Sequence, residues 1–155
     1  MEKNPVLEPV ARTYRELSHD EIFMMFKARV DIFVVEQACA YPEIDDIDRD
    51  LNTRHILFLE QGCLKAYARC YPKSDTVVAI GRVLITPESR GSGMGYTLMH
   101  AALACVKQHY PDSQVHIAAQ SYLQPFYCKL GFEPMGDVYL EDGIEHIDMQ
   151  LQQLG

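Results

Sequence analysis

Arg90-Gly91-Ser92-Gly93-Met94-Gly95 joins two segments of different hydrophobic periodicity. The run before it, residues 78–86, is typical of a strand that Pro87 ends, and the residues after it repeat with the period of an amphipathic helix. A glycine-rich loop at a helix start presents free backbone N–H groups, and the aligned peptide dipoles favour an anion there. The glycines allow close approach, and Arg90 adds a positive charge. The stretch therefore predicts a cradle for a phosphate or pyrophosphate.

The spacing of the glycines excludes two common phosphate-binding loops. A dinucleotide-binding fingerprint, G-x-G-x-x-G, would need glycine where the chain has Tyr96 or Leu98. A Walker A loop needs Gly-Lys-Ser/Thr, which the chain lacks. The pattern that fits is Arg90-x-x-Gly93-x-Gly95 after a strand and a proline. For the loop taken alone, an ordinary glycine-rich turn without a ligand stays open as the alternative.

A second pattern follows at residues 115–132. Residues 115–120 read as a short strand, and a helix that begins near Ser121 can hold Pro125 in its first turn. Gly131 is typical of the helix C-cap before the next strand. Tyr127, which lies on this helix, is on its own either a buried core aromatic or a catalyst.

Together the two patterns resemble the GNAT superfamily of acetyl-CoA-dependent N-acetyltransferases. Arg90 to Gly95 matches the cofactor motif Arg/Gln-x-x-Gly-x-Gly/Ala, and Tyr127, Gly131 and Phe132 match a helix that ends in Tyr-x-x-x-Gly-Phe. Gln120 stands where the superfamily usually has asparagine. Further matches, to the ElaA-like branch, span most of the chain: Phe33–Gln37, Tyr41, His55–Leu57, Ala68-Arg69, Gly81-Arg82-Val83, Ala119-Gln120 and Tyr139–Ile147.

The resemblance implies one N-acetyltransferase domain over residues 1–155 with a mixed α/β (α+β) fold. We expect a mostly antiparallel sheet with a central parallel βαβ pair, flanked by helices. The residue patterns agree, because a strand, a helix and a strand over residues 78–120 make a unit whose strands are parallel. Residues 55–60 and 64–71 read as a hairpin, and residues 10–15 as a first strand.

Two polar segments before the first hairpin need an interpretation. Ser18 and Glu21 predict a capping box. It starts a helix with an apolar face of Ile22, Phe23, Phe26 and Val30. The acidic run Glu43–Asp50 opens like an EF-hand calcium loop but has Leu51 and Leu57 where that loop needs glycine and glutamate. We interpret the run as a solvated loop, and the resemblance implies that it borders the acceptor pocket.

Composition narrows the class of protein. A net charge of −8 argues against nucleic-acid binding and favours a cationic acceptor such as an amine. No apolar stretch approaches the roughly 18 residues of a membrane span, and the N-terminus does not read as a secretory signal. Five scattered cysteines suggest reduced thiols and no metal site. We expect a cytoplasmic protein without a membrane partner; whether it forms a homodimer stays open.

The resemblance implies transfer of an acetyl group from acetyl-CoA to a primary amine of a small molecule or peptide, by direct attack in a ternary complex. Tyr127 would protonate the leaving thiolate as general acid, since a phenol of pKa near 10 can donate to a thiolate of pKa about 8.5. Backbone N–H groups of the strand before the loop would polarise the thioester carbonyl. The residues assigned to acyl-CoA binding are Val83, Leu84, Ile85, Arg90 to Gly95, Gln120 and Phe126.

The base that deprotonates the amine is left open between Glu36 and His146. Apolar neighbours of Glu36 would raise its pKa, and His146 has a suitable reference pKa near 6.5. Arg69 and Arg82 would hold a carboxylate, either of the acceptor or of Glu36. The residues assigned to the acceptor are Phe33, Arg69, Arg82 and Tyr139. Two alternatives stay open: a non-catalytic CoA-binding or interaction module, and acyl transfer with a different acyl-CoA or nucleophile.

Overall fold

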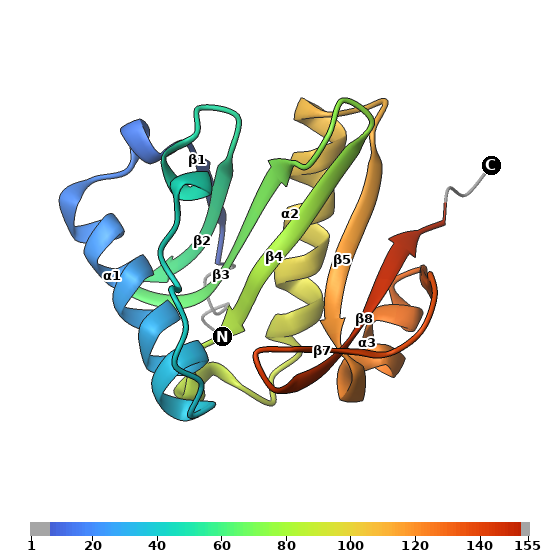
Figure 1. Cartoon of the computed structure of the whole chain (residues 1–155). Helices are drawn as coiled ribbons and strands as arrows, with labels where there is room; N and C mark the ends of the chain where they lie inside the picture. Colours follow the sequence, from blue (N-terminus) through green and yellow to red (C-terminus); the bar gives the residue numbers. More distant parts are fainter. Residues whose placement is uncertain (1–6, 153–155) are drawn as a thin grey trace, which may run out of the picture.

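The computed structural model describes residues 7–152, which form an eight-stranded sheet flanked by helices (Figure 1). Its strands are β1 (Pro9–Arg12), β2 (Arg54–Glu60), β3 (Cys63–Pro72), β4 (Val77–Ile85), β5 (Gln114–Gln120), β6 (Phe132–Pro134), β7 (Tyr139–Glu141) and β8 (Ile144–Leu151). The helices are α1 (His19–Arg29), a π-helical segment (Val30–Glu36), α2 (Met94–His109) and α3 (Gln124–Lys129), with short 3-10 turns between elements. No helix in this part of the chain is long and apolar enough to span a membrane.

The sheet has the order β1-β2-β3-β4-β5-β8-β6, and β7 pairs with β8. β4 and β5 are parallel, and the other neighbouring strands are antiparallel. The predicted mixed α/β fold with a mostly antiparallel sheet and one parallel pair is therefore confirmed.

Local sequence signals explain several element boundaries. The Ser18 hydroxyl accepts the Glu21 N–H at 3.1 Å, and the Glu21 carboxylate accepts the Ser18 N–H at 2.8 Å, so the capping box that starts α1 is confirmed. Gln61 and Gly62 have φ of 50° and 76°, as a tight hairpin turn requires, and the predicted hairpin is confirmed. The first strand ends earlier than predicted, because Thr13 caps a 3-10 turn at Tyr14–Glu16.

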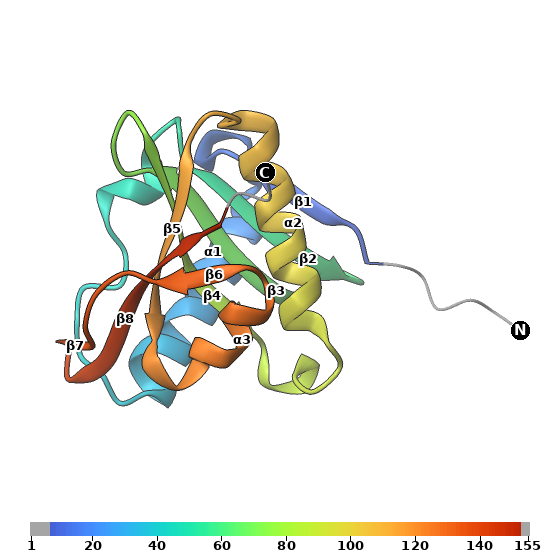
Figure 2. The ribbon, with the colours of Figure 1, turned by 90° about the vertical axis from the view of Figure 1, so that its right-hand side faces the viewer.

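Helices α1 and α2 cover opposite sides of the sheet (Figures 1 and 2). A large apolar cluster lies on the α2 side, where Leu98, Met99 and Ala102 of the helix are fully buried. A smaller apolar cluster around Met25 and Tyr67 lies on the α1 side. Apolar packing therefore fills the α2 side of the sheet, whereas it fills only part of the α1 side.

The predicted apolar face of α1 is wrong in part. Phe23 is 66% exposed, and the helix buries Glu21, Met25 and Arg29 instead. Buried charges are tolerated only where they are paired, and both charged residues have ion-pair partners. Ion pairs as well as apolar contacts therefore determine which face of α1 packs against the sheet.

The parallel pair β4–β5 is short. Val77 to Ala79 pair with Gln114 to His116, and beyond those residues the two strands are not registered against each other. β5 continues along β8, and β4 continues along β3. The strands therefore separate toward their C-terminal ends, as Figure 1 shows. This separation creates the opening in which the candidate site lies.

Candidate active site

A cavity of about 600 Å³ occupies the opening between β4 and β5. It brings together most of the predicted site residues: Phe33, Glu36, Arg82, Val83, Leu84, Ile85, Arg90, Gly95, Gln120, Phe126, Tyr127 and His146. Arg69, Tyr139 and residues 91–94 do not line it. It also includes polar residues that the sequence did not single out for the site, among them Tyr41, Lys73, His116 and Asp148.

The glycine-rich loop leads into α2 at one end of this cavity. Gly91 and Gly93 have φ of +83° and +78°, a conformation that glycine adopts without strain. Within the described chain, the N–H groups of residues 91–96 donate to no protein acceptor, and the first bond of the helix runs from Thr97 N–H to the Gly93 carbonyl. The loop and the first turn of α2 therefore present a row of free donors suited to an anion.

Arg90 extends from this loop to the end of the π-helical segment. Its Nη1 and Nη2 donate to the two carboxylate oxygens of Glu36 at 2.8 and 3.1 Å, and its Nε donates to the Ile85 carbonyl at 3.1 Å. Both charged side chains are exposed, and the guanidinium lowers the pKa of Glu36. The expected raised pKa of Glu36 is therefore wrong: an ion pair, which apolar neighbours cannot reveal, dominates its surroundings.

Tyr127 is placed by α3, which carries Pro125 in its first turn and is followed by Gly131 at φ +97°. Its side chain is 6% exposed and packs edge-on against Phe126 and Phe132 at 5.0 and 6.0 Å between ring centroids. Burial raises the pKa of Tyr127 to about 12. The phenol is therefore protonated at neutral pH, and is a weaker acid than its reference pKa near 10 suggests.

His146 lies on β8, directly opposite Gln120 on β5 and Tyr139 on β7. Its ring stacks on Tyr139 at 6.1 Å, and its Nδ1 lies 2.8 Å from the Ile144 carbonyl. Because a carbonyl only accepts, Nδ1 carries the proton in this contact, and Nε2 of the neutral ring keeps its lone pair. Nε2 lies 3.8 Å from Glu141. The neutral imidazole of this tautomer therefore has one ring nitrogen, Nε2, with a free lone pair.

β4 carries a bulge beside the cavity. Tyr67 and Arg69 of β3 are registered with Leu84 and Gly81 of β4, so two residues of β4, Arg82 and Val83, face the single residue Ala68. Arg82 has a φ of +52°, in the left-handed region. For a residue with a Cβ this conformation costs about 1–2 kcal/mol.

The hydrogen-bond direction along β4 follows from its last contact. The Thr86 N–H donates to the Lys65 carbonyl of β3 at 3.0 Å. Successive N–H groups of a strand point to opposite sides, so Leu84 also faces β3 while Ile85 and Val83 face the opening toward β5. Of the three predicted backbone donors, Val83 and Ile85 are thus the two directed toward the cavity.

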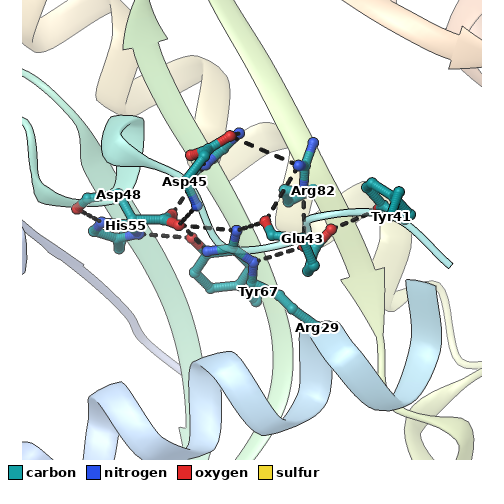
Figure 3. Close-up of polar contacts among 9 residues, drawn as sticks. Arg29, Tyr41, Glu43, Asp45, Asp48, His55, Tyr67 and Arg82 are labelled. Carbon is teal, nitrogen blue, oxygen red and sulfur yellow. Dashed lines mark hydrogen bonds and ion pairs between the residues drawn. The ribbon is translucent and has the colours of Figure 1, made fainter. Parts of the chain in front are cut away.

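Behind the bulge lies a buried ion-pair network (Figure 3). It joins three arginines, Arg29, Arg69 and Arg82, to three carboxylates, Glu43, Asp45 and Asp48. Arg29 and Asp48 are fully buried and 2.6 Å apart. The interpretation of residues 43–50 as a solvated loop is therefore wrong in part: Glu43 and Asp48 are buried and neutralise arginines from α1 and the sheet, whereas Asp46 and Asp50 are exposed.

Arg69 and Arg82 use their charges within this network. Arg69 donates to Asp45 and Asp48 at 2.7 and 3.0 Å, and Arg82 Nε donates to Glu43 at 2.8 Å. Neither has Glu36 as a partner among the contacts of the described chain, and only Arg82 lines the cavity. Which arginines pair with which carboxylates depends on the fold, and no pattern in the sequence indicates the pairs.

His55 and Tyr67 extend the network into the α1 side of the sheet. His55 Nδ1 lies 2.6 Å from the Tyr67 hydroxyl, and its Nε2 lies 2.9 Å from the Asp48 carbonyl. His55 is fully buried, and this burial lowers its pKa. The imidazole is therefore a neutral structural group in the folded protein at neutral pH.

Comparison with known proteins gives a consistent result. A family model described as "Acetyltransferase (GNAT) domain" matches residues 21–153. A UPF0039 protein of Schizosaccharomyces pombe is 41% identical over 148 residues, which cover 94% of this chain and 97% of the yeast protein. Protein ElaA of Escherichia coli is 41% identical over 138 residues, covering 88% of this chain and 90% of ElaA.

Solved structures agree with these sequence matches. The crystal structure of Escherichia coli ElaA has a TM-score of 0.89 at 40% identity and covers 94% of this chain and 100% of ElaA's. An acyl-CoA N-acyltransferase from Pseudomonas aeruginosa has a TM-score of 0.90 at 35% identity, with 95% and 100% of the two chains covered. The similarity therefore extends over nearly the whole chain.

Proposed function

The chain belongs to the GNAT acetyltransferase superfamily, in its ElaA-like branch, and from this premise we propose that it transfers an acetyl group from acetyl-CoA to a primary amine. The acceptor is a small molecule or a peptide, and transfer takes place directly in a ternary complex. The observation that carries the proposal is the row of free N–H groups at residues 91–96 beside a cavity that reaches Tyr127 and His146.

The glycine-rich loop would hold the pyrophosphate of acetyl-CoA. Free backbone donors at a helix N-terminus recognise phosphate oxygens without a bulky side chain in the way. Arg90 would add charge to this contact, in competition with Glu36. Phe126 and Gln120, which line the cavity between the loop and β5, would border the rest of the cofactor.

The reacting thioester would lie at the separated ends of β4 and β5. The N–H groups of Val83 and Ile85 would polarise its carbonyl oxygen as the carbon becomes tetrahedral. Attack by the amine nitrogen forms the C–N bond, and collapse breaks the C–S bond. Tyr127 would then donate its phenolic proton to the leaving thiolate, at a larger thermodynamic penalty than an exposed tyrosine because burial raises its pKa.

His146 is the better candidate for the base. Its Nε2 is available to accept the proton of the attacking amine, directly or through water, while Nδ1 is fixed by the Ile144 carbonyl. Glu36 has both carboxylate oxygens bound to Arg90 and a lowered pKa, which makes it a poor base in this arrangement. Phe33, which lines the cavity, would border the acceptor, and Tyr139, which does not line it, would act through its stacking on His146.

A thiol-release assay tests the proposal. The protein is incubated with acetyl-CoA and a panel of small amines and peptides, with propionyl-CoA and butyryl-CoA as alternative donors. We expect amine-dependent release of free CoA that is fastest with acetyl-CoA. Faster release with a longer donor would favour a different acyl group on the same scaffold, as the name of the Pseudomonas acyl-CoA N-acyltransferase allows. Binding of acetyl-CoA without release would favour a non-catalytic CoA-binding module.

A further inference from the structure

Arg82 has an unusual backbone for its place in the sheet. Four residues other than glycine have a positive φ in the described chain: Ala38, Gln61, Arg82 and Asp142. Three of them lie in turns, where this conformation is common, and Arg82 alone lies within a strand. It forms the bulge that precedes the two N–H groups directed into the opening. A strained residue at this point requires contacts that hold it there.

Those contacts come from the ion-pair network. Arg82 Nε donates to Glu43 Oε1 at 2.8 Å, and its Nη2 donates to the Glu43 carbonyl at 3.3 Å. The same Glu43 Oε1 accepts from Arg29 Nε at 2.9 Å, and its other oxygen accepts from the Tyr41 hydroxyl. Glu43 is buried and fixed from three directions, so it offers a rigid anchor for the side chain of Arg82.

We propose that the buried network acts, through Glu43 and Arg82, as a positioning device that keeps the β4 bulge in place and so directs the Val83 and Ile85 N–H groups at the thioester carbonyl. The inference rests on the proposed function. Arg82 and Glu43 are then positioning residues. The bond of the Arg82 guanidinium to Glu43 fixes the backbone of Arg82, and this backbone sets the direction of the neighbouring N–H groups. The six charges of the network then serve the geometry of the cleft as well as the stability of the fold.

The proposal predicts different activities for two substitutions of Arg82, whereas direct binding of the substrate by the guanidinium would predict the same activity for both. Arg82→Gly and Arg82→Ala both remove the guanidinium and its bonds to Glu43. Glycine adopts a positive φ without strain, whereas alanine in that conformation is destabilised and favours a relaxed strand. Glycine is therefore expected to keep the bulge and alanine to lose it.

The test compares both variants with wild type in three measurements: turnover and KM with an amine accepted in the thiol-release assay, the Kd values of acetyl-CoA and of CoA by calorimetry, and melting curves. Gln61→Gly and Gln61→Ala are the matched control, since Gln61 has a φ of 50° in an exposed hairpin turn and does not line the cavity. The Gln61 pair is expected to differ in stability only.

We expect Arg82→Gly to keep turnover within about threefold of wild type. Arg82→Ala is expected to lose about tenfold or more, because complete removal of one oxyanion donor costs about 10²–10³-fold and this variant misdirects the donors without removing them. Acetyl-CoA is expected to lose affinity relative to CoA in Arg82→Ala only.

Equal turnover of the two variants would overturn the proposal. An equal rise of KM for the amine in both variants would assign the guanidinium to acceptor binding instead. If no amine is accepted, the proposed function fails, while the ratio of the two Kd values still tests the bulge.

Discussion

The two sides of the sheet are built on different principles. On the α2 side, apolar residues such as Leu98 and Met149 are fully buried against one another. On the α1 side, the smaller apolar cluster is joined by a network of six ionised side chains around Arg29 and Asp48. Apolar packing tolerates small rearrangements, whereas buried ion pairs require defined partners and distances.

The functional elements are also divided between the two sides of the sheet. The cofactor loop opens α2, and Tyr127 belongs to the apolar cluster on that side. The bulge at Arg82 is attached to the ion-pair network on the other side. We infer that the apolar side supplies most of the folding free energy and that the charged side fixes the shape of the cleft. The predictions that follow test this division, from the largest expected effect to the smallest.

Arg29→Met should have the largest effect on stability. The substitution removes one of the two arginine partners of each of the buried carboxylates Glu43 and Asp48, which costs about 3–5 kcal/mol of unfolding free energy. Urea unfolding measures it. Lys27→Met on the same helix is the control, because the exposed pair of Lys27 with Asp31 contributes at most about 0.5 kcal/mol. A loss below about 1 kcal/mol for Arg29→Met would mean that the network contributes little.

Leu98→Ala tests the apolar side by creating a cavity. Leu98 is fully buried, so we expect a loss of about 3 kcal/mol, within the usual range of about 2–5 kcal/mol for such changes. The loss should be the same at pH 7 and pH 5, since no charge is disturbed. A loss that varies with pH would show that the two sides of the sheet are energetically coupled.

Gly93→Val tests the cofactor loop, which opens the apolar side. Valine is strained at the φ of +78° and narrows the approach to the free N–H groups, so acetyl-CoA affinity should fall at least about tenfold, or 1.4 kcal/mol. Gly62→Val is a matched control, because Gly62 has a φ of +76° in the β2–β3 turn and, like Gly93, open space around the Cβ position. Calorimetric titration that gives equal affinities for Gly93→Val and wild type would remove the loop from the cofactor site.

The pH dependence of stability should report on the charged side. Burial lowers the pKa of His55, so the unfolded state binds the proton first, and stability falls as the pH drops from about 6.5 toward the lowered pKa. The arginines lower the pKa of Asp45 and Asp48, so a second loss begins below about pH 4, as these carboxylates protonate. Urea unfolding from pH 7 to pH 5 should show a slope that His55→Gln flattens. An unchanged slope would exclude His55 as its source.

Features set by neighbours in the sequence could be predicted. The Ser18 capping box, the Gln61-Gly62 hairpin and the start of α2 after Gly93 each depend on a few adjacent residues. The parallel pair followed from the strand, helix and strand order alone. These elements also place the glycine-rich loop and Tyr127 at one cavity. Most of the residues proposed to bind the cofactor could therefore be predicted from the sequence.

Features set by distant partners could not be predicted. Arg29 meets Asp48 across 19 residues, and Arg90 meets Glu36 across 54, and no local pattern indicates either pair. The acidic run Glu43–Asp50 is typical of a solvated loop, because its arginine partners are distant in the sequence. The φ of Arg82 depends on one extra residue in β4 relative to β3, which hydrophobic alternation does not reveal.

Tyr127→Phe tests the central claim, acyl transfer with Tyr127 as general acid, most directly. The substitution keeps the ring that packs on Phe126 and Phe132 and removes the phenolic proton. With an accepted amine, turnover should fall about 10²-fold or more, while acetyl-CoA affinity and the melting temperature stay near wild type. Turnover near that of wild type would contradict the account, because the thiolate would then be protonated without Tyr127.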